Sequence, residues 1–149
     1  MSRRSKVHRW VLNITVLSGL AAAGCGASRS DLGQVSGRIT LDGRPVPNAF
    51  VQFVSQEGGT TSYGRTDGAG AYRMEATRKS QGASLGANLV RISTADVQDQ
   101  GGKAVNVPEQ IPAEYNVRSD LVRKVEAGDN VFDFELKSAG KVVQPRLTD

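Results

Sequence analysis

The stretch at residues 35–53, VSGRITLDGRPVPNAFVQF, decides the fold of this chain. In its first part, Val35, Ile39 and Leu41 alternate with polar residues, which is the period-two pattern of a β-strand with one buried face. An Asp-Gly pair and two prolines follow and indicate a turn. The next run, AFVQFVS at residues 49–55, carries aromatic and β-branched side chains on both faces, which predicts a buried central strand.

The rest of the chain up to residue 137 continues as short strands separated by turn signals. The sequence predicts a hairpin over residues 61–75, a strand at 87–94, an irregular surface loop over 95–120 and a second hairpin over 121–136. No amphipathic helical pattern interrupts them. We therefore predict an all-β fold, a single Ig-like or transthyretin-like two-sheet β-sandwich of about seven strands.

The same alternation predicts which side chains form the core. Residues expected to share the buried face of a strand are Tyr72, Met74 and Ala76, then Val90 and Ile92, and finally Phe132, Phe134 and Leu136. Ile111 and Tyr115 are expected to hold the irregular loop against the body. A domain of about 100 residues buries enough surface to fold without disulfides.

The turn and strand signature is similar to the carboxypeptidase regulatory-like domain. The matching residues are Gly43, Pro45, Val46, Ala49, Val51 and Phe53 in the first half of the pattern, and Thr66, Asp67, Gly70 and Tyr72 in the second. The resemblance spans residues 34–137 and implies a sandwich of transthyretin-like, prealbumin-like topology. It implies a scaffold and no particular activity, because the transthyretin-related hydrolases need histidines that this region lacks.

Five of the matching residues form a turn motif whose expected role is structural. Gly43 and Gly70 suit backbone positions with positive φ, and Pro45 stiffens a turn. Asp67 is expected to accept backbone N–H bonds within its own turn. Tyr72 is expected to pack in the core with its hydroxyl near the surface.

The chain opens with a positively charged segment and a short apolar run. Residues 11–24 form a mainly apolar run that Asn13 interrupts, and the run is shorter than the roughly 20 residues that a membrane-spanning helix needs. A charged start, a short apolar run and then small residues are typical of a secretory signal peptide. The sequence LAAAGC at residues 20–25 resembles a bacterial lipobox, although Ala22 stands where leucine is most common.

This resemblance implies a lipid anchor. The chain would be cut between Gly24 and Cys25, and diacylglycerol would be joined to the Cys25 thiol. Each buried CH₂ contributes about 0.8 kcal/mol, so two or three acyl chains hold a small domain on a bilayer. An ordinary secretory peptide and an uncleaved anchor are the alternatives.

These interpretations divide the chain into four parts. Residues 1–24 form a helical lipoprotein signal peptide, 25–33 a flexible tether, 34–137 the sandwich domain and 138–149 a loose C-terminal tail. The expected location is the bacterial cell envelope, where the lipid attaches the domain to the periplasmic or outer-surface face of a membrane.

Charge and composition exclude several functions for the part of the chain after the signal peptide. The net charge is +4, but Arg3, Arg4, Lys6 and Arg9 stand in a segment without acidic residues. Removing these four from the 19 basic residues leaves 15, equal to the 15 acidic residues, so we expect no nucleic-acid partner. The single histidine, His8, falls in the same segment. We therefore expect no catalytic triad, no metal and no cofactor.

The remaining candidates for function lie on loops of the sandwich. Tyr63, Tyr115, Asp96 and Asp99 are the candidate binding residues, with an envelope protein or glycan as the expected partner. A calcium site is an alternative, for which the acidic residues in or beside the irregular loop are Asp96, Asp99, Glu109, Glu114 and Asp120. We expect a non-enzymatic structural or interaction module. The alternative is a hydrolase that works with carboxylates alone.

Overall fold

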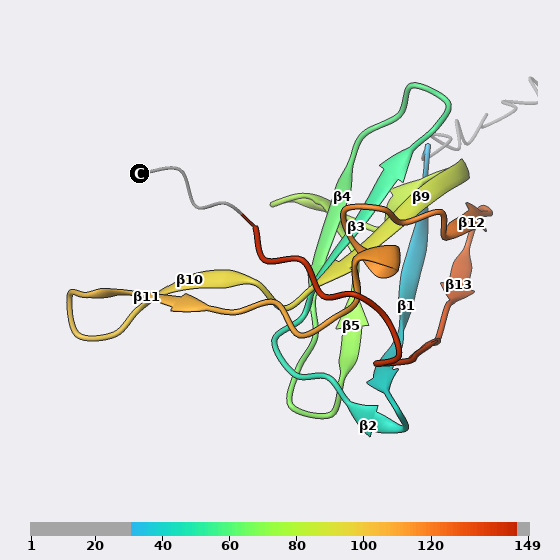
Figure 1. Ribbon diagram of the computed structural model, residues 1–149. Coiled ribbons are helices and arrows are strands. Elements are labelled where there is room, and N and C mark those ends of the chain that lie inside the picture. Colours follow the sequence, from blue (N-terminus) through green and yellow to red (C-terminus); the bar gives the residue numbers. More distant parts are fainter. Residues whose placement is uncertain (1–30, 146–149) are drawn as a thin grey trace, which may run out of the picture.

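The computed structural model describes residues 31–145 (Figure 1). The predicted signal peptide, Gly24, Cys25 and most of the predicted tether lie outside the described residues. Within residues 31–145 the chain is built from strands and one short 3₁₀ helix. No helix in this range is long and apolar enough to cross a membrane. The prediction of an all-β, sandwich-like fold is confirmed.

The first sheet is organised around the long strand β1, Leu32–Leu41. On one side β1 pairs in parallel with β13 (Asp129–Val131) and β14 (Phe134–Leu136). On the other side it pairs antiparallel with β8 (Ala83–Ser84), β5 (Ala71–Arg73) and β2 (Arg44–Pro45). A single ten-residue strand therefore joins the first and the last parts of the domain.

The second sheet is antiparallel and has the strand order β12-β9-β3-β4-β6-β7. Its strands are β12 (Val122–Val125), β9 (Gly86–Ser93), β3 (Phe50–Ser55), β4 (Ser62–Arg65), β6 (Glu75–Thr77) and β7 (Ser80–Gln81). The longest ladder joins β3 and β9 and runs from the pair Phe50–Ser93 to the pair Ser55–Asn88. This ladder is the platform that positions the candidate site.

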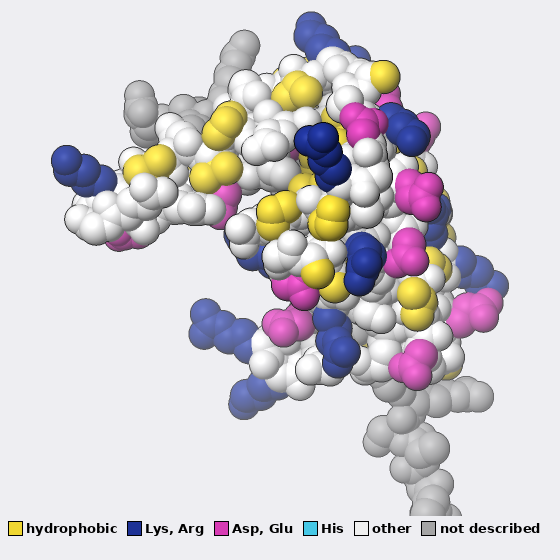
Figure 2. All heavy atoms as spheres, turned by 90° about the horizontal axis from the view of Figure 1, so that it is seen from below, with side chains coloured by type: hydrophobic (Ala, Val, Ile, Leu, Met, Phe, Trp, Pro, Cys, Tyr) yellow, Lys and Arg dark blue, Asp and Glu magenta, His cyan; other side chains and the backbone are white. Residues whose placement is uncertain are grey.

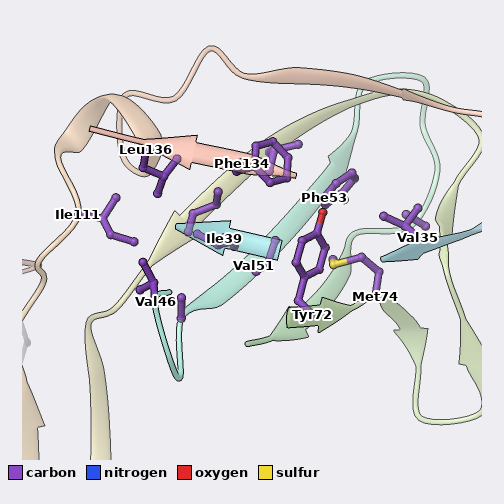
Figure 3. Close-up of a cluster of buried hydrophobic side chains, with 14 of the residues drawn as sticks. Val35, Ile39, Val46, Val51, Phe53, Tyr72, Met74, Ile111, Phe134 and Leu136 are labelled. Carbon is purple, nitrogen blue, oxygen red and sulfur yellow. The ribbon is translucent and has the colours of Figure 1, made fainter. Parts of the chain in front are cut away.

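The core lies between the two sheets, and Figure 3 shows its side chains converging from both. Ile39 from β1 and Val51 and Phe53 from β3 have no solvent exposure. The predicted inward residues are buried as expected in the cases of Tyr72, Met74, Ala76, Val90, Ile92, Ile111, Phe134 and Leu136. Phe132 and Tyr115 are partly buried and pack against this cluster.

The turn motif behaves as its residue types require. Gly70 has φ +74°, and a Cβ there would stand 2.5 Å from the Ile39 carbonyl oxygen. The Asp67 carboxylate accepts the N–H groups of Ala69 and Ala71, both at 2.9 Å. The Tyr72 hydroxyl donates to the Phe132 carbonyl oxygen at 2.7 Å. This hydrogen bond connects the turn motif to the segment between β13 and β14.

The rest of the motif lies in the preceding turn. Gly43 has φ +79°. Pro45 ends β2, whose two residues pair with the end of β1.

Two segments differ from their predicted form. Residues 121–136 do not make a hairpin, because β12 pairs with β9 in the second sheet while β13 and β14 pair with β1 in the first. The segment 95–120 holds a hairpin of β10 (Asp96–Asp99) and β11 (Ala104–Val107), followed by η1 (Ala113–Tyr115). We call this hairpin the arm. It projects from the body in Figure 1.

The sequence predicts a loose tail after residue 137, but residues 138–145 are bonded to the body. The Ser138 hydroxyl donates to the Asp42 carboxylate at 2.5 Å. The Lys141 carbonyl oxygen accepts the Ala113 N–H at 2.9 Å. These contacts place the segment beside η1, where it helps to form the candidate site.

Candidate functional site on the outer face of the second sheet

The solvent face of the second sheet carries two rows of side chains across neighbouring strands. One row runs from Tyr63 through Gln52 to Arg91, and the other from Arg65 through Phe50 to Ser93. Successive residues of a strand point to opposite faces, so the buried Val51 and Phe53 leave these residues on the outside. The rows combine two aromatic rings with two guanidinium groups on one flat surface.

The aromatic rings and one of the cations form a contiguous cluster. The rings of Phe50 and Tyr63 stack with their centroids 5.5 Å apart, and Tyr63 is 44% exposed. The Arg65 guanidinium carbon lies 6.0 Å from the Phe50 ring centroid. Rings that stack in this way offer an exposed π-face with a cation beside it.

Arg65 also connects the sheet to the base of the arm. Its Nη1 lies 2.9 Å from Asp96 Oδ2 in an ion pair that is open to solvent. The Arg65 guanidinium donates to the Asp96 carboxylate and holds the pKa of that carboxyl below its usual value. Asp96 and Tyr63 therefore belong to the same surface.

A cleft of about 250 Å³ opens beside this cluster. It is lined by Phe50, Gln52, Arg91, Ser93, Glu109, Asn116, Val117, Val143 and Pro145. The sheet forms its floor, and the segments after β11 and β14 form its walls. Its lining is largely apolar and includes one guanidinium, that of Arg91, which suits a ligand with an apolar body and an anionic or hydrogen-bonding group.

Glu109 is the one acidic residue among those that line this cleft, and the residue is 5% exposed. Oε2 accepts the Ser93 hydroxyl at 2.5 Å. Oε1 accepts the N–H and hydroxyl of Thr94, both at 2.9 Å, and the N–H groups of Gln110 and Ile111, both at 3.0 Å.

The pKa of Glu109 reports the same environment. Burial alone raises the pKa of this carboxyl, but the hydrogen bonds from Ser93, Thr94 and Ile111 outweigh it and leave the pKa below its usual value. A carboxylate held ionised by five donors is a structural anion. A general acid needs a raised pKa, which Glu109 does not have.

The C-terminal segment closes one side of the cleft through Gln144. Its side-chain oxygen accepts the Glu109 N–H at 2.9 Å, and its amide donates to the Glu109 carbonyl oxygen at 3.0 Å. This pair of bonds imitates a strand contact and fixes Val143 and Pro145 as lining residues.

A second cleft of about 490 Å³ adjoins the first at the base of the arm. Ser93 and Pro145 line both clefts. The other lining residues of the second cleft are Ala95, Asp96, Val97, Asn106, Val107, Pro108 and Gln144. Together the two clefts make a continuous depression from the sheet to the arm.

The structure brings together two of the four predicted binding residues. Tyr63 and Asp96 are linked through Phe50 and Arg65, since Tyr63 stacks on Phe50 and Arg65 lies by Phe50 and pairs with Asp96. Tyr115 lies in η1, packs against the core, and its hydroxyl accepts the Lys137 N–H at 3.3 Å. Asp99 lies near the tip of the arm, where its carboxylate accepts the Gly102 N–H at 2.7 Å.

The acidic residues considered for calcium are not gathered into one site. Asp96 forms an ion pair with Arg65, and the Glu109 carboxylate already accepts five hydrogen bonds from the protein. Within residues 31–145 no group of three or more His, Cys, Asp or Glu side chains could hold a metal ion.

Sequence reasoning missed Phe50, Gln52, Arg65 and Arg91 as surface residues of the site. The run at residues 49–55 predicts a strand buried on both faces, whereas Phe50 and Gln52 are only partly buried and face outward. The signal that identifies them is the cross-strand register, which requires the pairing of β3 with β4 and β9.

Comparison with known proteins adds no family. No family model matches the chain, and no curated protein matches it. Among solved structures the chain is similar to part of the 9R-lipoxygenase from Cyanothece PCC8801, with 15% identity and a TM-score of 0.40. The match covers 72% of this chain but 16% of the lipoxygenase. A likeness this remote carries no argument about fold or activity.

Proposed function

We propose that this protein is a lipid-anchored, non-enzymatic module of the bacterial cell envelope that binds an envelope protein or glycan on the outer face of its second sheet. The lipobox-like sequence that ends in Gly24 and Cys25 supports the anchor. The aromatic cluster and the cleft beside Arg91 support the binding face. Glu109 is the acidic side chain that lines the 250 Å³ cleft, and its carboxylate oxygens already accept hydrogen bonds from the protein, so it is not free to act as an acid or a base.

The observation that carries the proposal is the position of the cleft relative to the start of the domain. Leu32 pairs with Ser84, next to the beginning of β9, whereas the cleft and the arm lie at its other end, around Ser93. Eight residues of strand separate these ends by about 25 Å. In Figure 1 the arm leaves the left side of the body, away from the start of β1 at the upper right. A tether attached at Leu32 therefore presents the cleft away from the anchored end.

Membrane attachment also lowers the affinity that the binding face must supply. Attachment to a membrane keeps the module close to other envelope components, and this raises their effective concentration. Modest affinity at an aromatic and cationic face is then sufficient for association. The ionic part of that affinity is expected to weaken as salt rises, because the cations are exposed.

Photo-crosslinking in intact bacteria tests the binding face. A photoreactive phenylalanine analogue replaces Tyr63, which is conservative because the aromatic ring is kept. The matched control places the same group at Val131 on β13, which is 70% exposed on the first sheet. We expect a defined adduct at position 63 and a weak or diffuse signal at position 131, and Arg91→Glu should reduce the adduct at position 63.

Equal labelling at positions 63 and 131, or an adduct that Arg91→Glu leaves unchanged, would contradict a binding role for this face. The anchor is tested separately by Cys25→Ser. That variant cannot take the lipid and is expected to keep its signal segment, so it should run as a larger, unlipidated species than the parent. A variant that remains in the membrane at the parent's size argues against lipid attachment.

A further inference from the structure

The arm is an exposed two-stranded ribbon. Its strands pair from Asp96–Val107 to Asp99–Ala104, and they form a sheet of their own. Val97 and Val105 are 50% and 37% exposed. Figure 2 shows hydrophobic side chains along the projection at the left of the view, with a cationic group at its tip. A two-stranded ribbon in water is only marginally stable and has two open edges.

The hydrogen bonds at the tip determine which main-chain groups point out of the ribbon. The Gln100 N–H donates to the Lys103 carbonyl oxygen at 2.9 Å. Hydrogen-bonded and non-hydrogen-bonded pairs alternate along an antiparallel ladder. The pair Gln98–Val105 is therefore bonded, whereas Ala104 and Asn106 direct their N–H and C=O groups to the free edge of β11.

The free edge of β10 is blocked by its own side chains. By the same alternation the main-chain N–H and C=O groups of Val97 point to the free edge of β10. The Val97 N–H donates to the Asp96 carboxylate at 2.9 Å. Asp96 is in turn held by Arg65. A carboxylate fixed on an edge in this way prevents another strand from pairing there.

The free edge of β11 has no such protection. Its sequence, Ala-Val-Asn-Val at residues 104–107, has no charged residue and no proline. Residues 104–106 are exposed. This is the kind of edge that pairs with another strand.

We propose that β11 pairs with β11 of a second copy of this chain, so that the two arms form a four-stranded antiparallel sheet. A two-fold axis through Val105 places Ala104 opposite Asn106 of the second copy, and the outward groups of these residues exchange about four main-chain hydrogen bonds. The two Val105 side chains then meet at a non-hydrogen-bonded position, where they are closest.

The edge chemistry is compatible with a second copy of this chain and disfavours an open fibre. In this register Lys103 stands opposite Val107, so no like charges oppose each other. Because Asp96 occupies the Val97 N–H and β10 carries the carboxylates of Asp96 and Asp99, β11 is the more available edge of each arm, and pairing through it alone closes the assembly as a dimer. The inference does not depend on the proposed ligand or on the lipid anchor.

Disulfide trapping tests the register directly. Val105→Cys in the full chain places two introduced thiols opposite each other at a non-hydrogen-bonded pair, where Cβ atoms are close enough for a disulfide. Val97→Cys is the matched control, because Val97 is more exposed than Val105 (50% against 37%) but lies on the protected strand β10. The parent chain, with Cys25 alone, gives the background. Under mild oxidation we expect roughly tenfold more disulfide-linked dimer from Val105→Cys than from Val97→Cys.

A second pair of variants distinguishes disulfides formed by edge pairing from disulfides formed by chance encounters in solution. Asn106→Pro removes an N–H that faces the partner and leaves the ladder with β10 intact, so it should abolish the dimer formed by Val105→Cys. Asn106→Ala keeps the N–H and should preserve it. Equal trapping at positions 97 and 105, no trapping, survival of the dimer with Asn106→Pro, or a disulfide to a different protein each overturn the proposal.

Discussion

Replacing Glu109 by glutamine removes the charge that organises the wall of the cleft. Glu109 is 5% exposed, and its carboxylate accepts five hydrogen bonds from Ser93, Thr94, Gln110 and Ile111. In the variant the amide oxygen can take the place of Oε1, and the amide nitrogen can donate to the Ser93 hydroxyl. The shape and the contacts are kept, so the substitution reports on the charge.

Hydrogen bonds to a charged acceptor are roughly twice as strong as neutral ones, whose net contribution is about 1 kcal/mol each. Four donors at Oε1 lose this assistance, while the neutral amide has a smaller cost of burial. We expect Glu109→Gln to lower the free energy of unfolding at pH 7 by roughly 2 kcal/mol.

The pH dependence provides a second test of the same reasoning. The pKa of Glu109 in the folded protein lies below the reference value of 4.5. A depressed pKa means that the stabilisation is complete above the unfolded pKa and is lost as pH falls through the folded pKa. The difference between parent and variant should therefore be largest near neutral pH and should shrink below about pH 4.5.

Urea unfolding of the purified protein at a series of pH values measures this difference. Glu114→Gln is the matched control, because Glu114 is an exposed carboxylate on the adjacent 3₁₀ helix. Its effect should stay within about 0.5 kcal/mol. A difference for Glu109→Gln that is the same at pH 7 and pH 3 would refute the assignment of Glu109 as a structural anion.

Three further substitutions probe the frame around the site. Gly37→Ala places a Cβ 2.0 Å from the Phe132 carbonyl oxygen. We expect it to lower the free energy of unfolding, measured in urea, by about 2 kcal/mol or more. A neutral effect would show that β1 and the segment before β14 are not in close contact. Tyr72→Phe removes the 2.7 Å bond to the same carbonyl and should cost about 1 kcal/mol, with the near-ultraviolet spectrum otherwise native. Asp96→Asn breaks the exposed ion pair with Arg65, so the free energy of unfolding should change by less than about 1 kcal/mol. Hydrogen exchange of the main-chain amides in the arm should accelerate. Unchanged exchange would mean that the ion pair does not hold the arm.

The alternation of residues predicts the inner face of the second sheet but not its outer face. Val90 and Ile92 alternate with polar residues, so their burial follows from the sequence. In β3 both faces are apolar, and periodicity cannot distinguish Phe50 on the outer face from Phe53 in the core. Only the packing of the first sheet on one side decides this.

The arm shows why weak strands escape sequence reasoning. Its two strands have no buried face that would impose alternation, and they include Asp, Gln and Asn. The useful signal is the pair Gly101 and Gly102, whose φ values of +66° and +84° turn the chain between the strands. A Gly-Gly pair between short polar runs was the available evidence for a hairpin.

The connection over residues 121–136 could not be assigned from local pattern. A hairpin and a crossing from one sheet to the other need the same alternation on each side of a turn. The choice depends on distant partners, because Val122 pairs with Leu89 while Asn130 pairs with Val35. The same long-range packing gathers Glu109 and Gln144 beside Ser93, and this explains why the cleft has no sequence motif.

Mass spectrometry of the N-terminal peptide of the protein purified from bacterial membranes tests the central claim most directly. The account predicts a mature chain that begins at Cys25 and carries a thioether-linked diacylglycerol, with or without an additional N-acyl chain. A chain that begins at another residue, or one that begins at Cys25 with a free thiol, would contradict the account of a lipid-anchored envelope module.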